Sequence, residues 1–372
     1  MRRAVGVAIC LGLLASYALF LSRVFESPSV RPSSTDSLSL SKTPKSIFGN
    51  GKLQALVLLE DGSAELVDGQ NGIQVNRLET AAPFQSGMLS AKGEAYLMDD
   101  RKVLYRWMPG KKVAKSRPIK IEGDVLSIAV EENPHVLWCI ARRQRPEPES
   151  LMVYAISLEN GKQIGSVNLE AHRGQISLVA SQNGNGIIVA TTDSPGAFYF
   201  KYVDKVLISK FLDAKDLVDS SAFDGSEVLL GLRTGNVQRF QPATGVLLRT
   251  YTTDFLPVTQ LVISGSEIAV AHGDGDGVNG TGSAYLVDSK SGAVLLRQGT
   301  RDRTLAVAGS NGHFGYLFGS RDGTLQLLKR GKGALRVDVP AKYVLGSTGW
   351  MTGSEGTFLL IGSRKIEKLD FE

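Results

Sequence analysis

The sequence predicts an all-β protein made of about eight repeated four-stranded sheets, and three observations lead to this fold class. After Lys45, short runs rich in Val, Leu, Ile, Tyr and Phe are separated by Gly, Asp, Asn and Ser turns. No long stripe of helical periodicity interrupts these runs. A unit of strand, tight turn and strand also recurs, at intervals of about 40 residues. Meandering sheets in this number close most economically as a radial β-propeller, because closure hides sheet edges that would otherwise pair with other chains.

Composition is that of an ordinary folded protein. The chain has 372 residues, of which 42% are hydrophobic, and a formal net charge of +5. Lys and Arg are scattered through turns, for example at Lys111 and Arg142, so we expect no nucleic-acid partner. The two cysteines are Cys10 and Cys139, which leaves no internal disulfide in the folded part. One repeat domain therefore accounts for most of the chain.

The N-terminus carries the signal of a membrane segment. Residues 1–22 contain an uninterrupted apolar run from Ala4 to Leu21, which is long enough to span a bilayer. Arg2, Arg3 and the amino group outweigh Arg23, so the N-terminus should stay cytoplasmic while the propeller crosses to the periplasm, a lumen or the cell exterior. We expect an uncleaved signal anchor that forms one transmembrane helix.

Cleavage of this leader is the alternative. Ser16-Tyr17-Ala18 fits the small-residue rule for a signal peptidase, and a cleaved chain would be secreted. The apolar run continues through Leu21, past that point, which favours the anchor. Residues 23–44 are rich in Ser and Pro and predict a flexible linker, followed by the propeller at 45–372.

The repeat unit is clearest in four places, where two strands flank a glycine turn. These turns are Asn71-Gly72, Asn160-Gly161, Thr244-Gly245 and Ser291-Gly292. Degenerate copies bring the total to about eight. Trp107, Trp138 and Trp350 lie in strand-like runs and are interpreted as packing between blades.

The last unit ends before a fourth strand. Its first three strands are expected at Tyr343–Gly346, Thr357–Ile361 and Lys365–Leu369, and the missing outer strand is expected from Ser46–Phe48, which would latch the ring. Seven blades is the alternative, if the weak unit at 45–82 merges with the last.

At its turns the chain resembles quinoprotein-type, or pyrroloquinoline-quinone-like, propeller repeats. In that family an Ala-x-Asp-x-x-Thr-Gly segment is followed four residues later by a Trp that docks one blade on the next. The matching stretches here are 155–162, 241–245 and 288–292, and the chain also looks somewhat like WD-repeat proteins. The docking positions, however, hold Asn76, Gly165, Arg249 and Leu296.

The resemblance implies the fold and the precedent of membrane-tethered propellers that scaffold assemblies outside the cytoplasm. It does not extend to redox activity, because the residues that hold the quinone and its calcium in that family have no counterpart here. We therefore expect no cofactor from this resemblance.

The stretch from His272 to Gly282 is the most unusual in composition. Asp274, Asp276 and Asn279 alternate with glycines and are candidate calcium ligands, although Val278 occupies a ligand position of the EF-hand pattern and no Glu closes the loop. A long hairpin loop is the favoured interpretation. Asn279-Gly280-Thr281 also matches a glycosylation acceptor, a pattern expected by chance in a chain of this length.

Two functions remain after this survey. The first is a membrane-anchored extracytoplasmic scaffold that binds another protein. The second is an enzyme, or a binder of a small ligand or glycan, with its site in the central channel. The scaffold is favoured because no catalytic residues stand out, and charged side chains converging from the innermost strands would favour the second.

Overall fold

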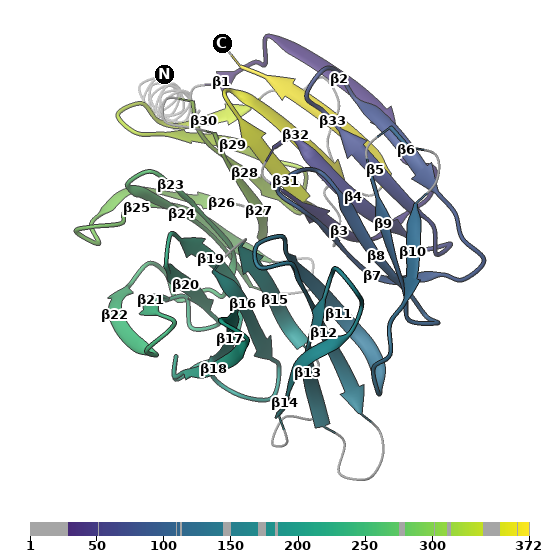
Figure 1. The fold of residues 1–372 in the computed structure, drawn as a ribbon. Helices are drawn as coiled ribbons and strands as arrows, with labels where there is room; N and C mark the ends of the chain where they lie inside the picture. The colour runs from purple at the N-terminus through teal and green to yellow at the C-terminus, as the bar shows by residue number, and fades with distance from the viewer. Residues whose placement is uncertain are drawn as a thin grey trace, which may run out of the picture.

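The computed structural model describes residues 29–50, 52–108, 110–111, 114–143, 150–169, 176–182, 185–274, 280–300, 302–310, 314–337, 350–362 and 364–371. These residues form eight antiparallel sheets arranged radially (Figure 1). The predicted propeller is confirmed, and so is the count of eight blades over the alternative of seven.

Each blade is a meander of four strands, numbered here from the innermost outward. Blade 1 consists of β3 (Pro44–Gly49), β4 (Gln54–Leu59), β5 (Ala64–Asp68) and β6 (Gln74–Leu78), and blade 2 of β7 (Phe84–Leu89), β8 (Ala95–Asp99), β9 (Val103–Trp107) and β10 (Lys115–Pro118). Blade 3 consists of β11 (Asp124–Glu131), β12 (Val136–Arg143), β13 (Ser150–Ser157) and β14 (Gln163–Leu169), and blade 4 of β15 (Ile176–Gln182), β16 (Gly186–Thr191), β17 (Ala197–Val203) and β18 (Val206–Leu212).

The second half of the ring repeats this order and takes two additional strands from the N-terminal side. Blade 5 consists of β19 (Val218–Asp224), β20 (Glu227–Leu232), β21 (Val237–Gln241) and β22 (Val246–Tyr251), and blade 6 of β23 (Val258–Ser264), β24 (Glu267–Asp274), β25 (Thr281–Asp288) and β26 (Val294–Thr300). Blade 7 consists of β27 (Thr304–Ser310), β28 (Gly315–Ser320), β29 (Leu325–Lys329) and β30 (Gly333–Val337), with β1 (Ser29–Val30) as a fifth strand. Blade 8 consists of β31 (Trp350–Ser354), β32 (Thr357–Gly362) and β33 (Lys365–Asp370), with β2 (Ser34–Ser39) as its outer strand.

The ring is closed by β2, which pairs antiparallel with β33 from Ser34↔Asp370 to Ser39↔Lys365 (Figure 1). The expected latch was wrong, because Ser46–Phe48 lies in β3, the innermost strand of blade 1. The expectation of a flexible linker at 23–44 also needs correction for its described part. Backbone pairing of β2, and of β1 with β30, holds this polar segment against the propeller although all six β2 residues are exposed. Tyr343–Gly346 lies outside the described residues, and β31 is the innermost strand of blade 8.

Apolar side chains from neighbouring blades form eight clusters, one at each blade-to-blade interface. Leu359 and Ile361 of blade 8 pack with Ala55 and Val57 of blade 1, and all four are fully buried, so the ring is closed by an apolar interface like the others. Trp107 and Trp138 are buried in two of these clusters, as predicted. Burial of such area is the main stabilising contribution to a fold without disulfides.

One basic side chain takes part in blade docking at a position where quinoprotein-type repeats carry a tryptophan. The Arg249 guanidinium donates to the Lys290 carbonyl in the next blade and lies 6.0 Å from the Tyr251 ring centroid. Gly165 stands at another of these positions, where a Cβ would come within 3.0 Å of Leu207 in the next blade. Leu207 of the neighbouring outer strand therefore occupies the space beside this position.

The predicted transmembrane helix at 1–22 lies outside the described residues. Within the part of the chain that the structure describes, there is no helix with the length and apolar character needed to cross a bilayer.

Candidate functional site

The predicted calcium loop falls mostly outside the structure. Asp274 ends β24 and is exposed, and its cross-strand partner in β25 is Thr281. Asp276 and Asn279 lie outside the described residues, so the calcium and glycosylation sites stay predictions. Among the described residues, no group of three His, Cys, Asp or Glu side chains is placed to hold a metal ion.

The innermost strands carry few charged residues, and most of their carboxylates are already engaged. Asp219 forms an ion pair with Arg233, at 2.8 Å. Asp224 likewise pairs with Arg239, at 2.9 Å. The eight inner strands consist otherwise mainly of Ser, Gly, Ala and larger apolar residues. This composition does not provide the convergent set of acids and bases that the channel-enzyme alternative requires.

Glu131, at the end of inner strand β11, is fully buried and joins two blades. One carboxylate oxygen accepts the Trp138 indole N–H at 2.8 Å, and the other accepts the Gly186 backbone N–H of blade 4 at 2.7 Å. Because both donors are also buried, this carboxylate satisfies polar groups inside the interface. We assign it a structural role.

His272 belongs to a second buried network, in the connection between blades 5 and 6. Its Nδ1 lies 2.9 Å from the Leu256 carbonyl oxygen, and its Nε2 lies 3.0 Å from Thr253 Oγ1. Burial lowers the pKa of His272, while the Leu256 carbonyl and the Asp254 carboxylate act in the opposite direction. The neutral imidazole therefore holds the connection at residues 252–257 in place through two hydrogen bonds.

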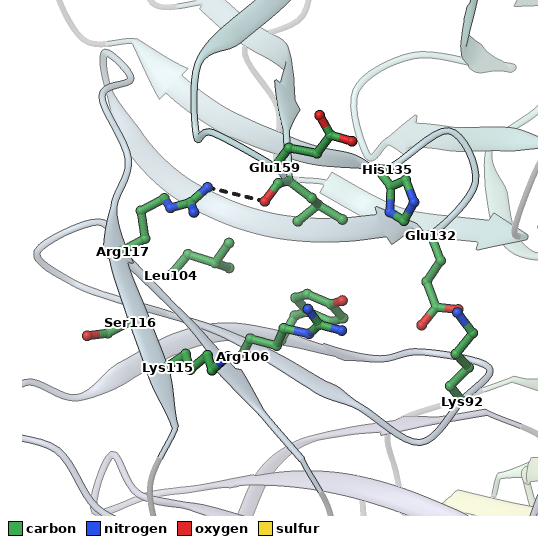
Figure 2. A pocket seen from close by; sticks show the side chains of 11 residues that line it. Lys92, Leu104, Arg106, Lys115, Ser116, Arg117, Glu132, His135 and Glu159 are labelled. Atoms are coloured by element: carbon green, nitrogen blue, oxygen red, sulfur yellow. Dashed lines mark hydrogen bonds and ion pairs between the residues drawn. The ribbon is translucent and has the colours of Figure 1, made fainter.

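A cleft between blades 2 and 3 is lined by acidic, basic, hydroxyl and apolar side chains (Figure 2). It encloses about 410 Å³. Blade 2 contributes the β7–β8 turn and strands β8, β9 and β10, and blade 3 contributes its β11–β12 and β13–β14 turns. The site is therefore assembled at a blade interface and not in the central channel.

Glu132 lies at one end of this cleft, beside Lys92 (Figure 2). The Glu132 side chain is only 8% exposed, and one of its oxygens lies 3.3 Å from Lys92 Nζ. The other oxygen, Oε1, is buried and has no hydrogen-bond partner among the described residues. A buried carboxylate oxygen without a donor is costly, so this atom is a natural acceptor for an N–H or O–H group of a bound molecule.

The floor of the cleft combines an apolar patch with a fixed ion pair. Leu104 and the Tyr96 ring provide the apolar surface, and Arg106 bonds in bidentate fashion to Glu94, with both distances 2.8 Å. Burial raises the pKa of Tyr96 to about 12, although the Arg106 charge opposes the shift. The Tyr96 hydroxyl therefore stays neutral, donates to Glu94 at 3.2 Å and can still accept a hydrogen bond.

The opposite end of the cleft carries two cationic side chains, and Glu159 of blade 3 also lines it. Lys115 and Arg117 extend from the exposed edge strand β10, and neither forms an ion pair with a described residue. Arg117 donates one hydrogen bond, to the Leu158 carbonyl of blade 3 at 3.2 Å (Figure 2). This bond positions the guanidinium at the blade interface and leaves its remaining donors available to an anionic group.

Sequence patterns did not single out this cleft. Its two halves are about 40 residues apart along the chain, as with Lys92 and Glu132, and only the packing of two blades brings them together. A weak signal was present in Lys115-Ser116-Arg117-Pro118, a basic edge strand among outer strands of mixed composition.

Comparison with known proteins supports the fold and does not assign a family. No protein-family model and no curated protein matches the sequence. Among solved structures, the chain is similar to BamB from Moraxella catarrhalis, with 10% identity, a TM-score of 0.59, and coverage of 90% of this chain and 98% of that one. It is also similar to the computationally designed Ika8 protein, with 13% identity, a TM-score of 0.63 and the same coverages.

A third similar structure is the β-propeller domain of Cps50 (Swd1) from Myceliophteria thermophila. The identity is 14% and the TM-score is 0.54, over 91% of this chain and all of that one. At these identities the likeness concerns the fold alone, which agrees with the propeller expected from the quinoprotein-type resemblance.

Proposed function

We propose that this chain is a membrane-anchored, extracytoplasmic propeller that binds another protein, and that the cleft between blades 2 and 3 receives an acidic segment of that partner. The observation that carries the proposal is the cleft itself. It pairs a buried acceptor, Glu132 Oε1, with two cationic side chains that have no carboxylate of their own, Lys115 and Arg117.

An extended acidic peptide matches each part of this cleft. A backbone N–H would satisfy Glu132, and an Asp or Glu side chain would lie between Lys115 and Arg117. A short apolar side chain would pack on Leu104 and Tyr96, which form the floor. Complementarity of this kind selects a partner by charge and register more than by area.

Anchoring rests on the N-terminal sequence. The apolar run from Ala4 to Leu21 and the flanking arginines favour a span with the N-terminus in the cytoplasm. Strand β1 begins at Ser29, a short distance along the chain from this segment, and both β1 and β2 belong to the propeller. An anchor at this position would hold the ring at the membrane surface through its own closing strand.

Site-specific cross-linking in membranes tests the proposal. A photoreactive amino acid at Ser116, between Lys115 and Arg117, should give one stoichiometric cross-linked partner. The charge-reversal variant K115E/R117E should lose it, because two cations become two like charges facing an acidic ligand. The matched control is K290E/K332E, which reverses the same number of charges at exposed turns of blades 6 and 7.

The control should retain the cross-link and the wild-type melting temperature. A chain that gives no cross-linked product at Ser116, or that gives equal yields in K115E/R117E and wild type, contradicts the cleft assignment. A propeller that external protease cannot reach in sealed cells or vesicles of known orientation contradicts the extracytoplasmic placement.

A further inference from the structure

Large apolar side chains are exposed along the outer strands of consecutive blades. Outer strand β22 exposes Val246 and Leu248 by 53% and 47%, and β26 exposes Val294 by 46%. Leu247 on β22 and Phe211 on β18 extend the row, and we call these five residues the apolar rim. The other described outer strands lack such a row of exposed apolar side chains, so the apolar rim is an exception among them.

Those other edges are covered, charged or mixed. β30 is covered by β1, and β33 is covered by β2. The β10 edge carries Lys, Arg and Pro, a composition that discourages pairing with other chains. An apolar row on an uncovered edge is an aggregation hazard unless something in the cell covers it.

The rim is continuous from blade to blade. A Cβ on Gly245, at the start of β22, would lie 3.1 Å from the Phe211 carbonyl oxygen of β18. On the other side, Arg249 of β22 donates to Lys290 in the turn before β26. Phe211, β22 and β26 therefore form one surface on blades 4, 5 and 6.

The charges of this surface have one sign. β18, β22 and β26 contain no Asp or Glu, and each contains one basic residue. These residues, Lys210, Arg249 and Arg297, are all exposed. An apolar row flanked by cations is the pattern of surfaces that lie in the interface of an anionic bilayer.

The attachment of the N-terminal segment supports the same orientation. Ser29 of β1 is paired in parallel with Arg336 of β30, on the outer edge of blade 7 and next to blade 6. The seven residues from Arg23 to Ser29 extend at most about 24 Å. A domain of this size is on the order of 50 Å across. If the outer edges of blades 2 and 3 rested on the membrane, blade 7 would lie on the far side of the ring. The segment from Arg23 to Ser29, which we call the tether, is too short to cover that distance.

We infer that the apolar rim lies on the bilayer surface, with its leucines and valines among the headgroups and its basic side chains on anionic lipid phosphates. This inference rests on the anchor proposed above. With blades 5 and 6 on the bilayer, the edge of blade 7 stands on the order of 15 Å above it, within reach of the tether. The cleft between blades 2 and 3 then faces away from the membrane, where a partner can approach.

Lipid-quenching fluorescence on the full chain tests the orientation. A Cys10→Ala chain carries Leu248→Cys, labelled with a polarity-sensitive fluorophore, in vesicles of phosphatidylcholine and phosphatidylglycerol. Cys139 is buried and its thiol pKa is raised by burial, so it does not compete for the label. The matched control is Ser116→Cys on the edge strand of blade 2. Circular dichroism establishes that both labelled chains are folded.

We expect spin-labelled headgroup lipids to quench most of the fluorescence at 248 and none at 116. Equal quenching at the two positions, or none at 248 in a chain that resists carbonate extraction, overturns the rim assignment and leaves the anchor standing. A label at 248 that is unquenched in vesicles but shielded in a dimer assigns the rim to a second copy, and also overturns it. Extraction of the chain by carbonate contradicts the anchor itself.

Discussion

Removing the Glu131 carboxylate should loosen the interface between blades 3 and 4. In Glu131→Ala, the Trp138 indole N–H and the Gly186 backbone N–H each lose the buried oxygen that they contact at 2.8 and 2.7 Å. An unsatisfied buried donor costs about 1 to 3 kcal/mol, so the two together should lower the free energy of unfolding by about 2 to 6 kcal/mol. In Glu131→Gln one oxygen remains to accept, and the amide NH2 faces the other donor, so an intermediate loss is expected.

Guanidinium denaturation of the detergent-solubilised chain measures this loss, and hydrogen exchange at Gly186 reports it locally. The control is Glu122→Ala, because Glu122 is 71% exposed and its pair with Arg143 lies on the surface. That change should stay within about 0.5 kcal/mol of wild type. If Glu131→Ala behaves like this control, and Gly186 keeps its protection from exchange, the assigned role of the carboxylate is wrong.

Two further predictions concern the docking arginine and the buried histidine. Arg249→Ala should lower the free energy of unfolding by about 1 kcal/mol, because the exposed charged hydrogen bond to the Lys290 carbonyl is lost. A loss below about 0.3 kcal/mol in denaturant unfolding would show that this contact does not help to dock the blades. For His272, burial favours the neutral ring in the folded state, so its contribution to stability is present above the ordinary pKa of 6.5 and is lost as the pH falls below it. Melting temperatures at pH 7.5 and 5.5 should therefore differ less in His272→Asn than in wild type, and an unchanged difference would exclude this residue as the cause.

The repeat pattern was sufficient to predict the number of blades, because the strands and turns of each sheet can be recognised from short stretches of sequence. Glycine turns such as Asn160-Gly161 connect the third and fourth strands, and Gly161 has a φ of 71°, which other residues rarely adopt. Strand and turn chemistry of this kind is written within a few residues of sequence.

The closing strand was misplaced for a physical reason. β2 has the sequence Ser-Thr-Asp-Ser-Leu-Ser and no buried side chain, so nothing in its composition distinguishes it from a linker. It is held by backbone bonds to β33, which any residue except proline can make, and by the Ser34 hydroxyl, which donates to the Asp370 carboxylate. Ser46–Phe48 has the apolar character expected of a strand, but that character serves an inner position in blade 1.

The candidate cleft was beyond sequence patterns because its residues meet only across a blade interface. Arg117 and Leu158 are 41 positions apart and are joined by one hydrogen bond. The unpartnered oxygen of Glu132 is a property of its surroundings, and no spacing of residues predicts it. The docking positions show the same limit. The sequence indicated that tryptophan was missing, and the contact of Arg249 with the next blade required the structure.

The claim on which the rest depends is that the polar segment Ser34–Ser39 closes the ring as the outer strand of blade 8. Disulfide cross-linking tests it directly, because Ser39 in β2 faces Lys365 in β33. Under mild oxidation, the double variant S39C/K365C should form an intramolecular disulfide, identified by mass spectrometry and by faster migration of the unreduced chain. S39C/K368C, displaced by three residues along the same strand, should not. Absence of the first cross-link, or equal yields in the two variants, would contradict the closure.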